Sequence, residues 1–122
     1  MFRRTTEAQE EITRTWAEVE AAVGSLKGRK FYGAFDVTTS EYCVCVQKRE
    51  GDDPEALGLE EGTLPGGRYA RERLKGDPPA VYGLIKPTFE RLAAQRPDED
   101  VSRPSIEFYR RHDLIDLLLP VS

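Results

Sequence analysis

The segment 103–121 limits most strongly what this chain can fold into, because it predicts two β-strands joined by a short turn. The first strand carries one carboxylate, Glu107, among aromatic and aliphatic neighbours. Strand side chains alternate between two faces, so Glu107 and Tyr109 share one face while Ile106 and Phe108 share the other. A carboxylate in such a place is either a solvated edge residue or the floor of a pocket. The rest of the sequence favours the pocket.

The composition predicts a single soluble domain with no nucleic-acid or membrane partner. A chain of 122 residues is long enough to bury one hydrophobic core. Its net charge of −4 argues against the phosphate attraction on which nucleic-acid binders depend. No apolar run approaches the roughly 20 residues that span a bilayer, and the first residues do not have the pattern of a signal peptide. We therefore expect a cytoplasmic protein.

The sequence contains no motif for a cofactor or a metal. Cys43 and Cys45 alternate within a predicted strand, and this spacing does not fit a Cys-x-x-Cys redox or zinc site. We expect both to be small buried residues in a reducing compartment. His112, the only histidine, falls in a predicted turn and is expected on the surface. No cofactor and no metal are therefore predicted.

The first half of the chain predicts the order strand, helix, strand, strand. After a short strand at 2–5, four apolar residues recur at helical spacing: Ile12, Trp16, Val19 and Val23. Gly24 is expected to end this helix, because glycine suits the left-handed position that follows a last turn. The segments 30–37 and 41–48 predict a hairpin. Gly33, inside a strand, indicates a bulge or the close approach of another group.

The second half predicts the same order of elements. A strand at 64–74 is followed by a second helical stripe: Val81, Ile85, Phe89 and Leu92. Pro87 lacks an N–H group and disfavours helical geometry in the residue before it, so we expect a kink or two short segments there. Strands at 104–111 and 114–121 close the chain.

The two halves, about 1–50 and 63–122, are joined by an acidic loop, so the chain (1–122) is predicted to be one α+β domain with a duplicated β-α-β-β pattern. Several short motifs follow this pattern in order. They are Arg4-Thr5-Thr6, Trp16, Tyr32-Gly33, Leu64-Pro65-Gly66-Gly67-Arg68-Tyr69-Ala70, Lys75-Gly76, Pro104-Ser105-Ile106-Glu107-Phe108-Tyr109 and Leu117-Leu118-Leu119-Pro120-Val121. By these motifs, over nearly its whole length, the chain resembles the GyrI-like small-molecule-binding domain.

The resemblance implies one curved antiparallel sheet with two helices on one face and a ligand cleft on the pseudo-twofold axis. It also implies a stand-alone protein that binds amphipathic, cationic aromatic molecules, as related domains do in multidrug-sensing MerR- and AraC-class regulators. One alternative is a hydrolase of electrophilic, cyclopropane-bearing xenobiotics, which some members of the family resemble. A further alternative is a module with a protein partner, such as a topoisomerase inhibitor.

By motif position, the residue expected to meet the ligand is Glu107. The resemblance also assigns Tyr32, Tyr69 and Tyr109 to the ligand. Two further candidates, Trp16 and Phe89, correspond to each other in the duplicated pattern. Trp16 is first of all expected to be a core residue that faces the sheet, with ligand stacking as the alternative. For a hydrolase, Glu107 is the expected general acid or base, and Tyr69 is the candidate for a hydroxyl that assists it.

A lone carboxylate among aromatic rings suits a lipophilic cation, because the rings offer apolar area and cation–π attraction. An unpaired Glu107 in such a place is expected to have a raised pKa, which also suits acid–base chemistry. The alternative is an ion pair between Glu107 and an arginine of a neighbouring strand: Arg71, Arg73 or Arg110. Asp116, on the last strand, is expected to be solvated.

Overall fold

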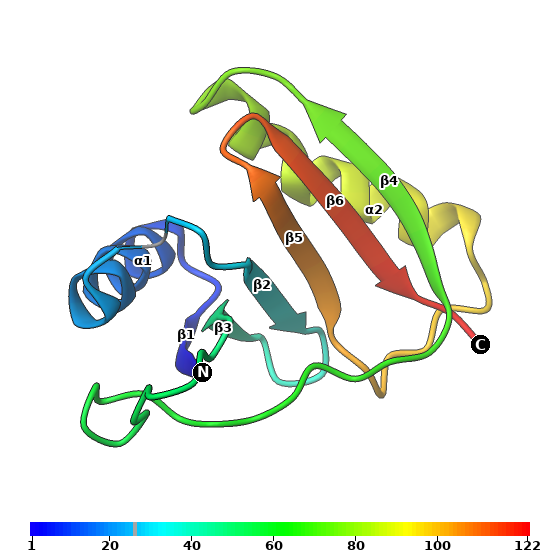
Figure 1. Ribbon diagram of the computed structural model, residues 1–122. Coiled ribbons are helices and arrows are strands. Elements are labelled where there is room, and N and C mark those ends of the chain that lie inside the picture. Colours follow the sequence, from blue (N-terminus) through cyan, green and yellow to red (C-terminus); the bar gives the residue numbers. More distant parts are fainter. Residues whose placement is uncertain (26) are drawn as a thin grey trace.

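The computed structural model describes residues 1–25 and 27–122, and these form one sheet and two helices (Figure 1). The elements are β1 (Phe2–Thr6), α1 (Gln9–Val23), β2 (Phe31–Asp36), β3 (Glu41–Val46), β4 (Tyr69–Lys75), the 3-10 helix η1 (Ala80–Leu84), α2 (Ile85–Gln95), β5 (Ser105–Arg111) and β6 (Leu114–Pro120). The expected strands and helices are all present. The largest difference is at β4, which begins at Tyr69 rather than at residue 64.

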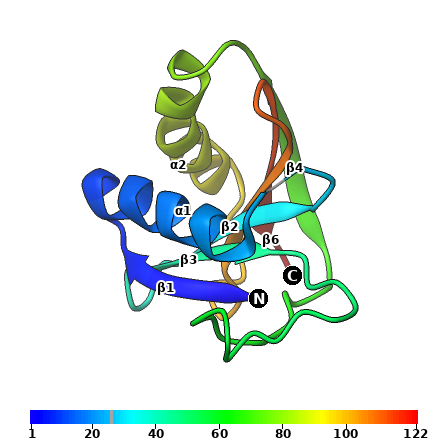
Figure 2. The same cartoon turned by 60° about the vertical axis from the view of Figure 1, so that its left-hand side comes forward.

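The sheet is a single antiparallel layer with the strand order β1-β3-β2-β5-β6-β4. Each half of the chain contributes three adjacent strands, and the halves meet where β2 pairs with β5. Both helices lie on the same side of this curved sheet (Figure 2). The α+β class and the duplicated β-α-β-β order are therefore confirmed.

The first helix forms where its apolar stripe predicts it. Val19 is fully buried, and Ile12, Trp16 and Val23 pack against the same cluster of apolar residues beneath α1. Gly24 ends the helix with a φ of 84°, and its N–H donates to the carbonyl of Glu20. Because glycine has no Cβ, it adopts this left-handed conformation without strain.

The second helix is divided in two, as Pro87 predicts. A 3-10 segment, η1, runs directly into α2, and Pro87 lies in the first turn of α2. The first turn of a helix has no use for the missing N–H, so proline is tolerated there. A second apolar cluster lies beneath this helix: Leu74, Val81, Ile115 and Leu117, with Ile85, Phe89 and Tyr109 packed against it.

Each helix covers the outer part of its own half of the sheet. The main contacts of α1 are with β1 and β3, whereas α2 packs on β6 and on η1. The two central strands, β2 and β5, therefore lie between the helices instead of beneath one of them. Among the described residues, no helix is long and apolar enough to cross a membrane.

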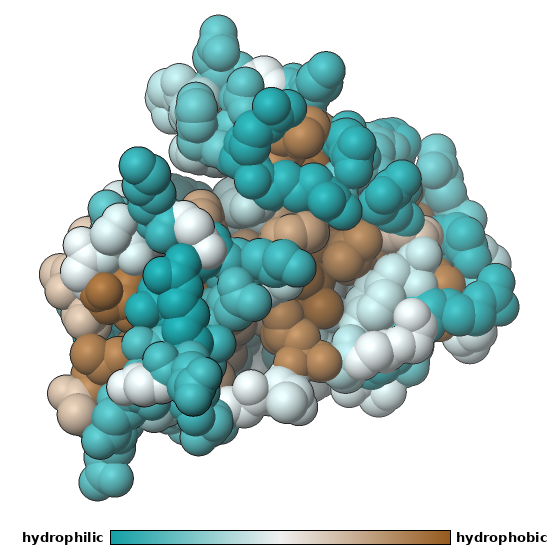
Figure 3. All heavy atoms as spheres, in the orientation of Figure 1, coloured by the Kyte–Doolittle hydropathy of each residue, from teal (hydrophilic) through white to brown (hydrophobic). Residues whose placement is uncertain are grey.

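The opposite face of the sheet carries no helix. Figure 3 looks onto this face and shows hydrophobic residues gathered across the middle of the molecule, roughly over β5 of Figure 1, with hydrophilic residues around them. We call the side that carries the helices the helical face and the other side the open face.

Candidate functional site

A cleft of about 1150 Å³ opens on the helical face between α1 and α2. Its lining comes from both helices, from η1 and from the central strands. The residues that matter for its chemistry are Glu7, Trp16, Glu20, Phe31, Phe35, Tyr42, Tyr82, Lys86, Phe89, Glu90, Glu99, Glu107 and Tyr109. The cleft thus lies over the junction of the two halves, where the resemblance implies it.

Glu107 forms part of the floor of this cleft. Its side chain points to the helical face from the central strand β5, and only 8% of the residue is exposed. Burial raises the pKa of the Glu107 carboxyl, because the charged form loses its hydration. Two hydrogen bonds act in the opposite direction, but the effect of burial is larger.

Two tyrosines hold one oxygen of Glu107. The hydroxyl of Tyr42 donates to Oε1 at 2.7 Å, and the hydroxyl of Tyr109 donates to the same atom at 2.6 Å. Burial and the neighbouring carboxylate raise the pKa of both tyrosines, so their hydroxyls remain protonated donors. The carboxyl group is thereby fixed in position from two sides.

Gly33 provides the space for this arrangement. It lies directly opposite Glu107 in the register of β2 and β5. A Cβ at residue 33 would lie 1.9 Å from the Tyr42 hydroxyl oxygen and 2.7 Å from Glu107 Oε1. The close approach that a glycine within a strand indicates is therefore present, and the approaching groups are these two side chains.

Aromatic rings form one end of the cleft. Trp16 meets Phe31 edge to face at a centroid distance of 5.5 Å and meets Tyr109 at 5.4 Å, while Phe31 and Tyr109 are stacked at 5.7 Å. Tyr82 of η1 adds a further edge contact with Tyr109 at 6.3 Å. These rings place a polarisable, electron-rich surface next to the carboxylate, which attracts cations.

The charges of the cleft are strongly one-sided. Five glutamates line it against a single lysine, Lys86: Glu7, Glu20, Glu90, Glu99 and Glu107. None of these carboxylates forms an ion pair with any residue that the structure describes. The negative potential in the cleft is therefore not neutralised from within the protein.

Two of the three arginines that could have paired with Glu107 bind another carboxylate, and Arg71 forms no ion pair with a described residue. Arg73 contacts both oxygens of Asp116, at 2.7 and 3.2 Å, and Arg110 donates to the same carboxylate. Asp116 pairs with Phe108 in the register, so it faces the open face, away from Glu107. It is 1% exposed, which corrects the expectation of a solvated position. The hydrogen bond from Arg73 lowers its pKa to about 2.

The structure places two of the expected cleft residues on the open face instead. Tyr32 stacks on Phe108 at 4.8 Å and lines a separate pocket of about 490 Å³. The hydroxyl of Tyr69 donates to the carbonyl of Pro65, and the guanidinium of Arg103 lies over its ring. The expectation that Tyr32 and Tyr69 line the same cleft as Glu107 is thus wrong, whereas Trp16, Phe89 and Tyr109 do line it.

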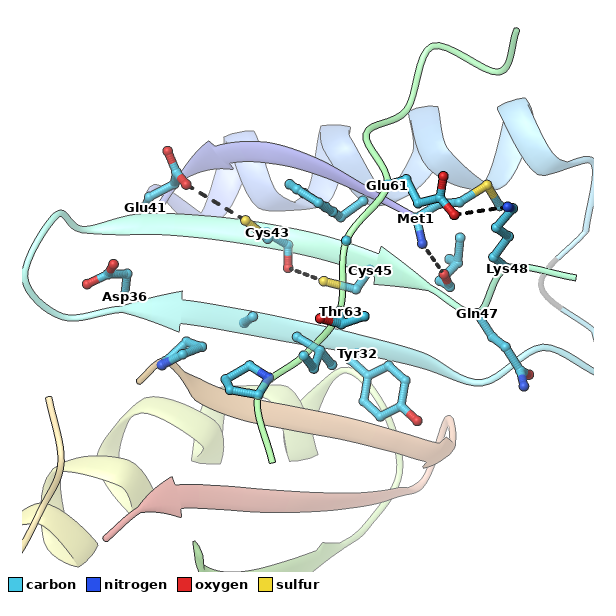
Figure 4. A pocket seen from close by; sticks show the side chains of 17 residues that line it. Met1, Tyr32, Asp36, Glu41, Cys43, Cys45, Gln47, Lys48, Glu61 and Thr63 are labelled. Carbon is cyan, nitrogen blue, oxygen red and sulfur yellow. Dashed lines mark hydrogen bonds and ion pairs between the residues drawn. The ribbon is translucent and has the colours of Figure 1, made fainter. Parts of the chain in front are cut away.

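The pocket on the open face also contains the cysteines. Figure 4 shows that Cys43 and Cys45 of β3 lie on the same face of the sheet as Tyr32 of β2. The segment 61–65 crosses over β3 and β2 on this face. Burial raises the pKa of Cys43 to about 11 and that of Cys45 to about 12, so both thiols are protonated and poorly nucleophilic. In the part of the chain that the structure describes, no cluster of three or more metal-ligating side chains is found.

Tyr42 is the site residue that the sequence did not reveal. Local signals were present: Tyr42, Val44 and Val46 alternate on one side of β3, and all three are buried. Because Tyr42 precedes Val44 by two residues, its side chain is expected on the same face of the strand. What no local signal gives is the pairing of β2 with β5, which brings Glu107 over Gly33 and within reach of a hydroxyl 65 residues away.

Comparison with known proteins gives a relative in fold. No protein-family model and no curated protein matches the chain. Among solved structures, an integron cassette protein from the mobile metagenome of Vibrio cholerae is similar, with a TM-score of 0.68 and 19% sequence identity. The match covers 100% of this chain and 87% of that chain. At this level of identity the likeness shows a shared fold.

Proposed function

We propose that this protein binds amphipathic cations with an aromatic or other apolar body in the cleft between α1 and α2. The observation that carries the proposal is Glu107, a buried carboxylate without a cationic partner among the described residues, at the floor of a large, partly aromatic cleft. An ionised carboxylate in such a place is costly until a positive charge compensates it. A ligand cation supplies that charge.

The walls of the cleft support the same class of ligand. Trp16, Phe31 and Tyr109 offer aromatic faces for an apolar body and for cation–π contact. The four further glutamates of the lining would draw cations towards the cleft and repel anions. We therefore propose that the ligand is a small molecule and that the protein senses or sequesters it, in agreement with the resemblance to the GyrI-like domain.

Hydrolysis is supported less well than binding. The raised pKa of Glu107 would suit a general acid or base near neutral pH. A hydrolase of this kind also needs a hydroxyl to assist the developing or leaving oxygen. The hydroxyls of Tyr42 and Tyr109 are both directed at Glu107 itself, and Tyr69 lies on the open face, bound to Pro65.

The test is a fluorescence titration with rhodamine 6G, a lipophilic cation, on the wild type and on Glu107→Gln. Glutamine keeps the volume of the side chain and an oxygen that accepts from both tyrosines, while it removes the charge and replaces the second oxygen with an NH2 group. We expect saturable binding to the wild type and a loss of affinity of about tenfold or more in the variant, or ~1.4 kcal/mol.

The matched control is Glu55→Gln, which makes the same change of net charge at an exposed residue outside the cleft. Its affinity should stay within about twofold of the wild type. Equal affinity in the wild type and Glu107→Gln, or no saturable binding to the wild type, would contradict the proposal. In that case a protein partner becomes the next candidate. Turnover of an electrophilic ligand that disappears in Glu107→Gln would instead favour the hydrolase.

A further inference from the structure

The two oxygens of Glu107 are not equivalent. Oε1 accepts hydrogen bonds from Tyr42 at 2.7 Å and from Tyr109 at 2.6 Å. A carboxylate oxygen accepts hydrogen bonds through its two lone pairs. Oε1 therefore has no capacity left for a third strong donor. Tyr42 is 3% exposed, and its hydroxyl lies over the backbone of Gly33. The bond from Tyr42 is therefore enclosed by protein, whereas Tyr109 reaches Oε1 from the wall of the cleft.

The other oxygen, Oε2, remains available. Among the described residues it receives no hydrogen bond, yet it is not one of the fully buried polar atoms without a partner. Since Glu107 lines the cleft, Oε2 is the atom that faces a ligand there. The carboxylate therefore meets a ligand through a single accessible oxygen.

This asymmetry affects different cations differently. A guanidinium or amidinium ion binds a carboxylate best with two parallel N–H groups, one to each oxygen. Here the second oxygen is already occupied, so one N–H of the fork would be buried without an acceptor, at a cost. A quaternary ammonium or phosphonium ion has no N–H to satisfy, and a primary ammonium ion needs no fork.

We propose that the cleft selects cations with a single positive centre over guanidinium and amidinium ions, and that Tyr42 and Tyr109 set this selectivity by occupying Oε1. The inference rests on the proposed function, because it concerns the same cleft and the same carboxylate. The two tyrosines act through Glu107, so they are positioning residues. Tyr109 in addition contributes its ring to the aromatic end of the cleft.

The experiment uses two ligands with the same apolar body, (4-phenylbutyl)trimethylammonium and (4-phenylbutyl)guanidinium, which compete with bound rhodamine 6G. The wild type should prefer the ammonium ion. The two head groups also differ in hydration, so the deciding quantity is the change of the affinity ratio between variants. In Tyr109→Phe, which keeps the ring and frees the lone pair of Oε1 on the side of the cleft, the ratio should shift by about tenfold towards guanidinium.

Tyr42→Phe provides a second variant, in case the first folds poorly, and should shift the ratio in the same direction, because Oε1 then again has a single donor. Phe89→Leu serves as the control, because it alters the cleft wall without touching Glu107 and should change both affinities alike. An unchanged ratio in both tyrosine variants, with both ligands still bound, overturns this inference alone. If neither ligand nor rhodamine 6G binds the wild type, the proposed function fails and this inference fails with it.

Discussion

At the scale of single residues, the site depends on Gly33, which has no side chain. Gly33 allows the Tyr42 hydroxyl and Glu107 Oε1 to lie directly over the backbone of β2. Its φ is not in the left-handed region, so backbone freedom is not the reason for a glycine here. The reason is space. Any other residue at this position would have to move two buried side chains on two different strands.

The first prediction concerns Gly33→Ala. The new methyl group would collide with both side chains, so we expect the free energy of unfolding to fall by about 1–3 kcal/mol, as for other overpacked cores. Rhodamine 6G binding should weaken as well, because Glu107 is displaced. Urea denaturation and the dye titration measure the two effects. Gly66→Ala is the control: a Cβ there meets nothing within 4 Å, and stability should change by less than about 0.5 kcal/mol.

Residue-scale chemistry could be predicted only where it depends on local pattern. The alternation of β5 correctly puts Glu107 and Tyr109 on one face. The same rule puts Tyr32 on the face opposite to Phe31, and only the family motif places Tyr32 in the cleft. The role of Tyr42 depends on the pairing of β2 with β5, which sequence alternation does not determine.

At the scale of elements, the open face of the second half is held together by charge. Asp116 of β6 binds Arg73 of β4 and Arg110 of β5, so one carboxylate links three neighbouring strands. Its arginine partners are each 43% exposed, whereas the carboxylate is enclosed. The guanidinium groups thus cover Asp116 and shield it from solvent while remaining hydrated themselves.

The second prediction concerns Asp116→Asn and its dependence on pH. The folded protein lowers the pKa of Asp116 from 3.8 to about 2. A lowered pKa means that the carboxylate stabilises the fold above pH 3.8 and that this contribution is lost as the pH falls towards 2. At pH 6 we therefore expect Asp116→Asn to be less stable than the wild type by about 1–2 kcal/mol. Near pH 2, where the Asp116 carboxyl of the folded protein is about half protonated, most of the difference should be lost.

Urea denaturation at both pH values measures this difference. The control is Asp77→Asn, an exposed carboxylate with no ion pair to a described residue, and it should show no such pH-dependent gap. Asp52 and Asp100 also have pKa values lowered to about 2 and destabilise every variant in acid, so only the gap between wild type and variant is diagnostic. A gap that stays constant between pH 6 and 2 would speak against the role given to Asp116.

For the helices, the local sequence is sufficient to predict the structure. The stripe through Trp16 and Val19 predicts α1, and Pro87 predicts the division between η1 and α2, because both depend on residues within one or two turns. Asp116 shows where it is not sufficient. Its burial depends on two arginines brought to it by strand pairing, and strand pairing is a property of the whole sheet.

At the scale of the whole molecule, two separate apolar clusters share one continuous sheet. One cluster lies beneath α1 around Val19 and Val44, and the other lies beneath α2 around Ile115 and Leu117. The pairing of β2 with β5 joins them, and the cleft lies above this seam. The inner margins of both clusters, among them Trp16 and Phe89, are also walls of the cleft.

The third prediction is that the two halves unfold together. Trp16 is the single tryptophan, so its fluorescence reports on the first half, whereas far-UV circular dichroism reports on both. Because the β2–β5 pairing makes one sheet of the two halves, the two urea curves should coincide. Rhodamine 6G at 100 times its Kd should shift both curves equally, by about 2.7 kcal/mol. Curves that separate, with or without the ligand, would indicate that the halves are independent units.

The duplicated scaffold has one more consequence. A perfectly symmetric cleft would offer every guest two equivalent orientations, related by a half-turn about the axis between the central strands. Here one of these strands bears Glu107, and the other, directly across from it, bears Gly33. The floor of the cleft therefore carries a charge on one side of this seam and no side chain on the other, so the two orientations differ in energy. Under the proposed function, a guest with a cationic head and an apolar tail is therefore expected to bind in a single orientation, with its head at Glu107.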